Sequence, residues 1–333
     1  MMKTRLQRLL PLAGAALLYG VILLLMATKV LPRSYQQMLP TICTYIIMAV
    51  SLNLVVGFLG DLSLGHAAFY AVGAYVGGMI LRYLTAIPFG VRVIVAIAAA
   101  AAVAFVIGGA FLYFVRKLHG DYLAIVTLAF GEFVRSIVKI IPGTGGSAGL
   151  TDIPTIAAGA FPIKYIKAFS WSYVIMVISI FLIVNLIRSR HGRAIMAVRD
   201  NSIAAASVGI NVSRCRIVTF AIAALFAGIA GVLYAANTAA VNPADFDYNV
   251  SIEVLVMVVL GGMGNIGGSI IATIILVALP KVLLDAAQYR LLIYAIALIA
   301  MMMLNANPRF TAFKRRVSEK TSKFVKSLGR GRD

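Results

Sequence analysis

The side chains best able to recognise a polar solute lie in three stretches that interrupt long apolar runs. The first stretch, residues 51–69, contains Asn53, Asp61, Ser63 and His66. Amide, carboxylate, hydroxyl and imidazole groups donate and accept hydrogen bonds, and on an apolar background they are typical of broken helices beside a solute path. We therefore expect these four side chains to line such a path. A simple turn at a membrane face is the alternative interpretation.

The second stretch, residues 142–152, contains Thr144, Gly145 and Gly146. Consecutive glycines expose backbone N–H groups, which can bind a carboxylate. The same glycines can instead form a flexible loop, so the sequence leaves both interpretations open.

The third stretch, residues 261–268, contains Gly261, Gly262 and Asn265, and Glu253 lies eight residues before it in an apolar run. The glycines indicate a tight turn or close helix packing. A carboxylate inside a membrane is costly and suggests a functional role or a buried partner. We place all four of these residues beside the solute path.

Several other chemistries are excluded or disfavoured. Residues 262–267 fit G-x-G-x-x-G, but they separate two apolar runs rather than a strand and a helix, so a dinucleotide site is not expected. No G-x-x-x-x-G-K-[ST] sequence occurs, so the chain has no P-loop for ATP hydrolysis. The three histidines stand apart from cysteine and carboxylate clusters, no serine lies in the strand-to-helix context of a nucleophile elbow, and no H-E-x-x-H is present. We expect no catalytic residue and no metal site.

The elements that hold these residues are membrane-spanning helices. Apolar residues make up 62% of the 333 residues, the mean hydropathy is +0.97, and the apolar residues form long unbroken runs. A run of about 20 apolar residues crosses a bilayer as a helix. The sequence therefore predicts an all-α, polytopic membrane protein with about ten spans, near 9–30, 38–57, 66–82, 93–115, 121–140, 171–188, 217–237, 249–262, 268–285 and 290–306.

Charge predicts the orientation of these spans. With the N-terminus in the cytoplasm, the cytoplasmic segments collect most of the basic residues, whereas the loop with Asp245 and Asp247 lies outside. The run after Arg8 is too long for the apolar core of a signal peptide, so we interpret it as a retained first span. Both termini are then expected in the cytoplasm.

The same pattern divides the chain into three parts. Residues 1–37 form a basic segment and the first span, residues 38–306 the transmembrane domain, and residues 307–333 a basic cytoplasmic tail. An external loop is expected at 141–170 and a cytoplasmic loop at 189–216. Because the net charge of +19 gathers in loops and in the tail, we expect contact with anionic lipids rather than nucleic acid, with a protein partner as the alternative for the tail.

Two packing features are expected inside the spans. Glu132 and Arg135 are three residues apart and should form an ion pair on one helix. Gly73 and Gly77 should let two helices approach closely.

The cytoplasmic loop 189–216 carries its own short helix. Asp200, Asn201 and Ser202 are candidate N-cap residues, and residues 203–208 make about two turns before Gly209. A short exposed helix flanked by basic residues can dock in a groove of a partner. An ordinary loop helix is the alternative.

Four blocks in this order resemble the branched-chain amino acid ABC transporter permease family of the LivM type. They are Leu52-Asn53-Leu54 with Gly60 to Phe69, Thr144 to Leu150, Gly192-Arg193 through Asn211, and Gly261 to Gly268. The resemblance covers roughly residues 40 to 305.

The resemblance implies a permease subunit with discontinuous helices in a bacterial inner-membrane importer. The implied partners are a homologous second permease, two cytoplasmic ATPases and an external substrate-binding protein. The chain itself would bind no cofactor, since ATP and magnesium belong to the ATPases. The expected substrates are leucine, isoleucine, valine or other apolar amino acids; urea or a short amide, or an ion-driven secondary transporter, remain alternatives.

The resemblance also implies that the loop around Gly192 to Gly209 contacts the ATPases. The general importer signature E-A-A-x-x-x-G aligns with Ile203, Ala204, Ala205 and Gly209 of this chain. Ile203 therefore stands where the signature has its glutamate. Asp200 is the nearest substitute. The residues expected to make this contact are Gly192, Arg193, Arg199, Asp200, Asn201, Ala204, Ala205 and Gly209.

Overall fold

The computed structural model describes residues 2–28, 32–156, 163–282, 295–296 and 299. Regular structure in these residues is helical, apart from one isolated antiparallel bridge between Leu150 and Val241. The α-helices are α1 (Met2–Ala27), α2 (Arg33–Asn53), α3 (His66–Tyr83), α4 (Phe89–Val115), α5 (Asp121–Ile140), α6 (Ile163–Arg188), α7 (Arg190–Asp200), α8 (Ser202–Ser207), α9 (Val212–Thr238), α10 (Tyr248–Gly261) and α11 (Ile266–Val282). A π-helix η1 (Leu54–Leu59) continues α2, and two 3₁₀ turns are η2 (Gly146–Ala148) and η3 (Pro243–Phe246).

Nine of the ten expected spans coincide with described helices, which confirms the all-α fold class. The tenth, 290–306, and the basic tail lie almost entirely outside the described residues. The expected external loop at 141–170 overlaps the start of α6 at Ile163, and the cytoplasmic loop at 189–216 overlaps the start of α9 at Val212. The first turns of both helices contain polar residues, so an apolar run alone places the start of each helix too late.

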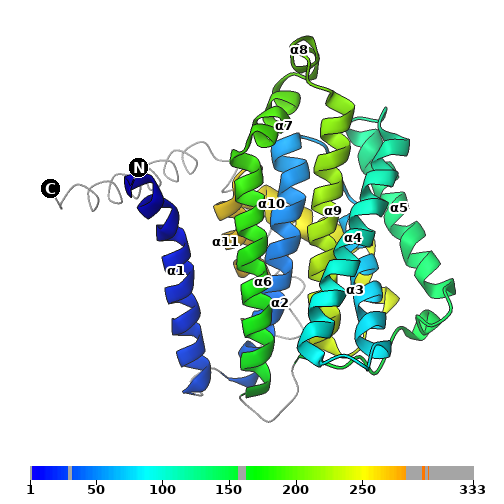
Figure 1. Ribbon diagram of the computed structural model, residues 1–333. Coiled ribbons are helices and arrows are strands. Elements are labelled where there is room, and N and C mark those ends of the chain that lie inside the picture. Colours follow the sequence, from blue (N-terminus) through cyan, green and yellow to red (C-terminus); the bar gives the residue numbers. More distant parts are fainter. Residues whose placement is uncertain (1, 29–31, 157–162, 283–294, 297–298, 300–333) are drawn as a thin grey trace. The chain divides into compact units, whose positions relative to one another are not determined.

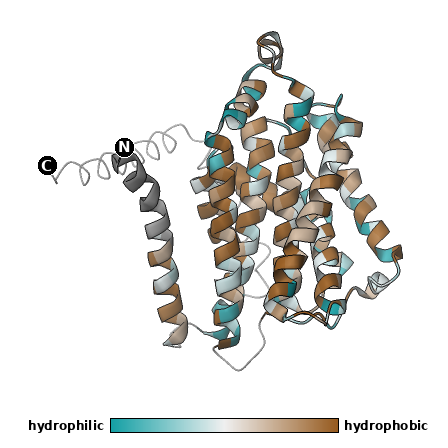
Figure 2. Ribbon diagram, viewed as in Figure 1, coloured by the Kyte–Doolittle hydropathy of each residue, from teal (hydrophilic) through white to brown (hydrophobic). Residues whose placement is uncertain are grey.

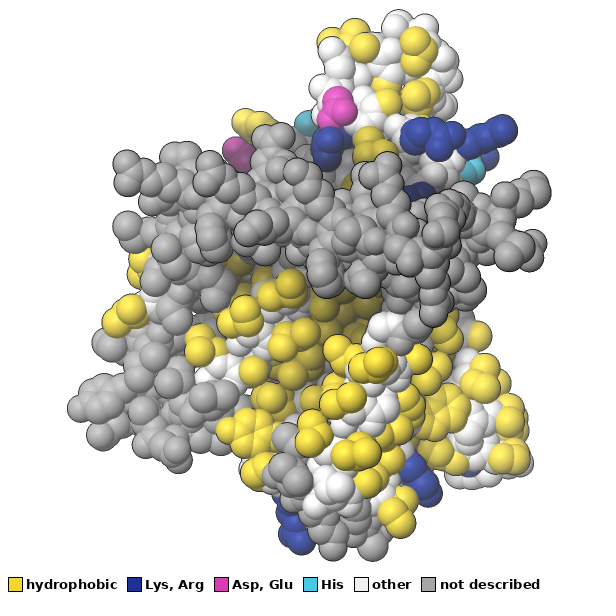
Figure 3. Space-filling model, turned by 90° about the vertical axis from the view of Figure 1, so that its left-hand side faces the viewer, with side chains coloured by type: hydrophobic (Ala, Val, Ile, Leu, Met, Phe, Trp, Pro, Cys, Tyr) yellow, Lys and Arg dark blue, Asp and Glu magenta, His cyan; other side chains and the backbone are white. Residues whose placement is uncertain are grey.

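Four described helices are long and apolar enough to cross a membrane: Arg33–Leu59, Phe89–Val115, Ile163–Arg188 and Val212–Thr238. Most residues of the described long helices have the colours of hydrophobic residues in Figure 2. In Figure 3 hydrophobic side chains cover much of the described surface, and the basic side chains lie near the top and the bottom of the view. Large apolar side chains such as Val106 and Ile125 are 64% exposed. A surface of this kind fits lipid better than water.

The chain divides into two compact units, residues 1–277 and 278–333. Within the first unit, α9 lies against α3 and α4 (Figure 1). Small residues allow these close crossings: a Cβ on Gly73 would strike the backbone of Gly228, and one on Gly108 would lie 2.5 Å from Cβ of Ala224. This confirms the packing role expected of Gly73, and Gly77 likewise meets Val232 of α9.

The α7–α8 segment leads from α6 to α9 and lies at one end of this unit (Figure 1). The loop that follows α5 lies at the other end. The expected short helix is present as α8, and α7 is an additional helix that precedes it.

Candidate functional site

The break after α2 is held against the turn between α10 and α11 by one asparagine. The side-chain Oδ1 of Asn53 accepts a hydrogen bond from the Gly264 N–H at 2.8 Å, and its Nδ2 donates to Ser269 Oγ at 2.9 Å. Asn53 is fully buried. Gly57 faces the same contact, and a Cβ there would strike both Asn53 Oδ1 and the Gly264 nitrogen. Two of the stretches singled out in the sequence therefore meet here, although they are 211 residues apart.

The helix loses its α-helical register immediately after Asn53. Residues Leu54–Leu59 form the π-helix η1, and Gly60 ends it in the left-handed region at φ 84°. A side chain at that φ is strained, and a Cβ on Gly60 would also lie 2.8 Å from Cγ of Arg199. π-helical turns are frequent at functional sites. The change from α-helix to π-helix therefore lies inside the 27-residue apolar helix Arg33–Leu59, and its place beside a solute path stays a prediction.

Asp61, the first residue after this break, forms a buried ion pair with Arg216 in the first turns of α9. Arg216 Nε lies 2.7 Å from Asp61 Oδ2, and its second terminal nitrogen lies 3.0 Å from Oδ1. The two side chains are only 5% and 11% exposed. This bidentate geometry, in which two N–H groups bind the two carboxylate oxygens, is the strongest way in which arginine binds a carboxylate.

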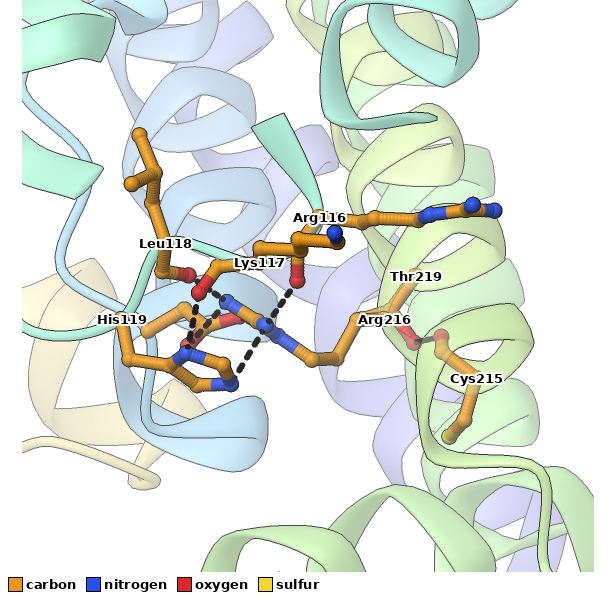
Figure 4. Close-up of polar contacts among 8 residues, drawn as sticks. Arg116, Lys117, Leu118, His119, Cys215, Arg216 and Thr219 are labelled. Atoms are coloured by element: carbon orange, nitrogen blue, oxygen red, sulfur yellow. Dashed lines mark hydrogen bonds and ion pairs between the residues drawn. The ribbon is translucent and has the colours of Figure 1, made fainter. Parts of the chain in front are cut away.

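The remaining N–H groups of Arg216 bind the connection between α4 and α5 (Figure 4). They donate to the carbonyl oxygens of Arg116 at 3.0 Å and Leu118 at 2.9 Å, and one lies 2.9 Å from Nε2 of His119. The His119 Nδ1 lies 2.9 Å from the Lys117 carbonyl oxygen, which can only accept. We therefore assign the proton to Nδ1, so that Nε2 accepts from Arg216. All five guanidinium N–H groups then have an acceptor.

The other polar residues of the first stretch are also buried. His66 Nε2 lies 2.8 Å from Ser51 Oγ, and both residues are within the helical interior. Ser63 is fully buried, and its hydroxyl is without a hydrogen-bond partner among the described residues. The loop between η1 and α3 is fixed by Leu64 N–H, which donates to Thr127 Oγ1 at 2.9 Å. The path-lining role of Asn53, Asp61, Ser63 and His66 stays a prediction.

The glycine-rich stretch after α5 is joined at its end to the segment after α9. Leu150 N–H donates to the Val241 carbonyl oxygen at 2.9 Å, and Val241 N–H donates back to Leu150 at 2.9 Å. Thr144 is fully buried, and its hydroxyl donates to the carbonyl oxygen of Val138 at 2.6 Å near the end of α5. Gly145 and Gly146 both have positive φ in the turn that follows. These two glycines allow the backbone to take the left-handed conformation of the turn. A solute contact at this turn stays a prediction.

The stretch at 261–268 is a tight turn, as its glycines indicate. Gly262 and Gly264 have φ of 92° and 78°, and Asn265 Oδ1 accepts from the Gly268 N–H at 3.1 Å to begin α11. Gly261 packs against the backbone of Gly268 and Ser269 with no room for a Cβ. The turn contacts Asn53, the last residue of α2 before η1. The two interrupted helical segments, α2–η1 and α10–α11, therefore lie together at this point.

Glu253 lies elsewhere, on an exposed face of α10. The ion pairs in the described part of the chain join Asp61 to Arg216, Glu132 to Arg135 and Asp200 to Arg199, so Glu253 has no cationic partner there. The Glu132–Arg135 pair, at 2.9 Å, confirms the pairing predicted from their spacing.

The short helix α8 is capped and exposed as the sequence predicts. Asn201 Oδ1 accepts from the N–H groups of Ile203 and Ala204, each at 3.0 Å, and Gly209 follows the end of α8 at φ 88°. Ile203 is 82% exposed and Val208 76% exposed, whereas Ala205 is buried. Two large exposed apolar side chains, one on α8 and one directly after it, fit a partner's groove.

Arg199, at the end of α7, connects this segment to the break. Its terminal nitrogen donates to the Gly57 carbonyl oxygen of η1 at 3.1 Å, and its other nitrogens bind Asp200 Oδ1 at 2.8 and 3.0 Å. Gly192, at the other end of α7, packs so closely against the Ile187 carbonyl that it has no room for a side chain. Arg193 is exposed and lies 3.5 Å from the Arg188 carbonyl oxygen.

A family model described as the permease component of the branched-chain amino acid transport system matches residues 34–306. The chain belongs to this family. The permease LivM of Escherichia coli strain K12 is 37% identical over 284 residues, which cover 78% of this chain and 66% of LivM. The probable permease LivM of Methanocaldococcus jannaschii is 29% identical over 283 residues, covering 74% of this chain and 80% of that protein.

The family also contains a second kind of permease. LivH of Escherichia coli strain K12 is 28% identical over 250 residues, covering 70% of this chain and 79% of LivH. The chain spans about two thirds of the length of the bacterial LivM relatives that it matches. No solved structure matches the chain significantly.

Sequence reasoning missed two features of the site, the Asp61–Arg216 ion pair and the inward direction of Arg199. In the sequence, Arg216 is one of many basic residues at the ends of predicted spans. A signal was present, however, because a carboxylate near an apolar span requires a cation or a proton to be buried. Among the basic residues at span ends, the sequence offers no way to choose this partner 155 residues away.

Proposed function

We propose that this chain is a membrane-spanning permease subunit of an ATP-driven importer, and that it provides the path for leucine, isoleucine, valine or other apolar amino acids. The observation that carries the proposal is the family match over residues 34–306, with relatives named as branched-chain amino acid permeases. The two broken segments joined by Asn53 and the exposed helix α8 support it, because an importer needs both a movable path and a contact for its motor.

The proposed assembly contains a homologous second permease, two cytoplasmic ATP-binding subunits and an external binding protein. LivM and LivH are distinct permeases in Escherichia coli, which supports a paired arrangement here. The chain has no P-loop, so ATP and magnesium would bind the partner subunits. We place the complex in the bacterial inner membrane with both termini in the cytoplasm and with anionic lipids against the basic residues.

In the proposed mechanism, ATP binding by the partners moves α8, and the path opens alternately to each side. A ligand can shift such an equilibrium only by its differential affinity for the two states, so uphill transport requires ATP hydrolysis. Asn53, Ser63, Thr144 and Asn265 are buried or hydrogen-bonded in the present structure. Opening a path along them would separate η1 from the Gly262–Asn265 turn and expose their polar groups.

The test is reconstitution in liposomes of the chain with its second permease, ATPases and binding protein. We expect uptake of labelled leucine that requires both ATP and the binding protein. ATP-dependent uptake of urea or a short amide, but not of leucine, would replace the substrate and keep the importer. Uptake by the lone chain under an ion gradient would refute the importer, and exposed Glu253 would then be the first candidate for an ion site.

A further inference from the structure

Two arginines, Arg199 in α7 before α8 and Arg216 in α9 after it, contact the end of the broken helix. Arg199 precedes α8 and donates to the Gly57 carbonyl oxygen inside η1 at 3.1 Å. Arg216 follows α8 and holds Asp61, directly after η1, at 2.7 Å. Both attachments therefore act on the short stretch between Gly57 and Asp61.

The Arg199 attachment reaches both broken segments. A Cβ on Gly60 would lie 2.8 Å from Cγ of Arg199, and a Cβ on Gly264 would lie 3.8 Å from its terminal nitrogen. The Arg199 stem thus packs on the end of η1, and its guanidinium lies beside the turn before α11. The Asp200 carboxylate holds this guanidinium from the solvent side at 2.8 Å.

The Arg216 attachment is rigid. Its five N–H groups reach Asp61, the carbonyl oxygens of Arg116 and Leu118, and His119. Any shift of the first turns of α9 must carry Asp61 with it or break several charge-assisted hydrogen bonds in a buried site. Asp61 is also joined directly to η1, because its N–H donates to the Val55 carbonyl oxygen at 3.2 Å.

Ile203 in α8 and Val208 directly after it are 82% and 76% exposed. Movement imposed on α8 therefore reaches the break through the chain on either side, where α7 packs on η1 and where Arg199 and Arg216 hydrogen-bond the Gly57–Asp61 stretch.

We propose that Arg199 and Arg216 are positioning residues that transmit displacement of α8 to η1 and to the Gly262–Asn265 turn. This inference rests on the proposed function, because it concerns how ATP-driven movement reaches the path. It assigns a role in coupling to Arg216 and Asp61, which otherwise would serve only stability.

The test compares Arg199→Lys and Arg216→Lys, which keep the charge but lose the planar fork. Arg116→Lys is the matched control: its side chain lies 4.8 Å over the Tyr113 ring, and its carbonyl oxygen remains for Arg216. Arg199 is 38% exposed, so its variant keeps the test valid if Arg216→Lys fails to fold. Leucine taken up per ATP hydrolysed is measured in reconstituted complexes, because this ratio does not depend on the amount of folded protein.

A second readout follows the break itself. In a chain with Cys43→Ala and Cys215→Ser, the change Met263→Cys places a thiol in the Gly262–Asn265 turn, where Met263 is 62% exposed. Its rate of alkylation is measured with and without ADP and vanadate, which trap ATPases. This readout requires no transported substrate.

We expect leucine per ATP to fall by about fivefold or more in both arginine variants, and the vanadate-dependent change in labelling to disappear, whereas Arg116→Lys retains both. Wild-type values of both readouts in Arg199→Lys would overturn the inference. So would labelling that vanadate leaves unchanged in the reference complex. Loss of leucine uptake in a reference complex whose labelling still responds would instead overturn the proposed substrate, and a chain that assembles with no ATPase would overturn both.

Discussion

At the scale of single residues, the Asp61–Arg216 pair has the largest expected effect on stability. Asp61→Asn leaves a buried guanidinium without its counter-charge, which costs about 3 to 5 kcal/mol. Glu132→Gln breaks a pair whose side chains are 38% and 26% exposed, and such pairs contribute less than about 1 kcal/mol. Thermal unfolding of the purified chain in detergent should show a much larger loss for Asp61→Asn. Equal losses would mean that water reaches the pair freely.

The same two pairs show what the sequence could predict at this scale. Glu132 and Arg135 are three residues apart on one helix, so helical geometry alone brings them together. Asp61 and Arg216 come together only through the packing of α3, α4 and α9. Asn53 is similar: its polar type marked it, but its contacts with Gly264 and Ser269 depend on two breaks folding against each other. Residue type identified the site, and long-range packing decided its contacts.

At the scale of elements, the crossing of α3 and α9 depends on a glycine. A Cβ on Gly73 would strike the Gly228 backbone, which cannot move aside as a flexible side chain can. We expect Gly73→Ala to lower stability by about 1 to 3 kcal/mol, despite the better helix propensity of alanine. Gly109→Ala is the control, because its Cβ would lie 3.5 Å from Ala221, an ordinary contact. Thermal unfolding in detergent compares the two, and a Gly73→Ala variant as stable as Gly109→Ala would contradict the prediction.

Most elements could be predicted, because a long apolar run in a membrane protein has few alternatives to a helix. Turn chemistry also predicted α8, since Asn201 caps it and Gly209 follows it. The π-helix η1 could not be predicted, because Leu54–Leu59 is as apolar as the α2 sequence before it. Its register depends on Asn53 and Gly57, which meet the Gly262–Asn265 turn in three dimensions. The pairing of Leu150 with Val241 is equally a tertiary contact, and the sequence gives no sign of it.

At the scale of the whole molecule, the described residues favour selection of the substrate outside this chain. An apolar amino acid in water carries one ammonium and one carboxylate group, and a selective site needs fixed partners for both. Among the described residues, Asn53 is held by Gly264 and Ser269, and Asp61 is held by Arg216. These side chains are engaged with the chain itself and are poorly placed to rank one amino acid above another.

We therefore expect substrate preference to follow the binding protein supplied to the proposed complex. Reconstituted transporters that differ only in this protein should show uptake preferences in the same order as the affinities of the free binding proteins, measured by calorimetry. The control is the reverse exchange, with one binding protein and a homologous permease pair, for which the order should stay the same. An order that follows the permease pair would place a selective site in the membrane, and the polar residues of the two broken segments would be the first to substitute.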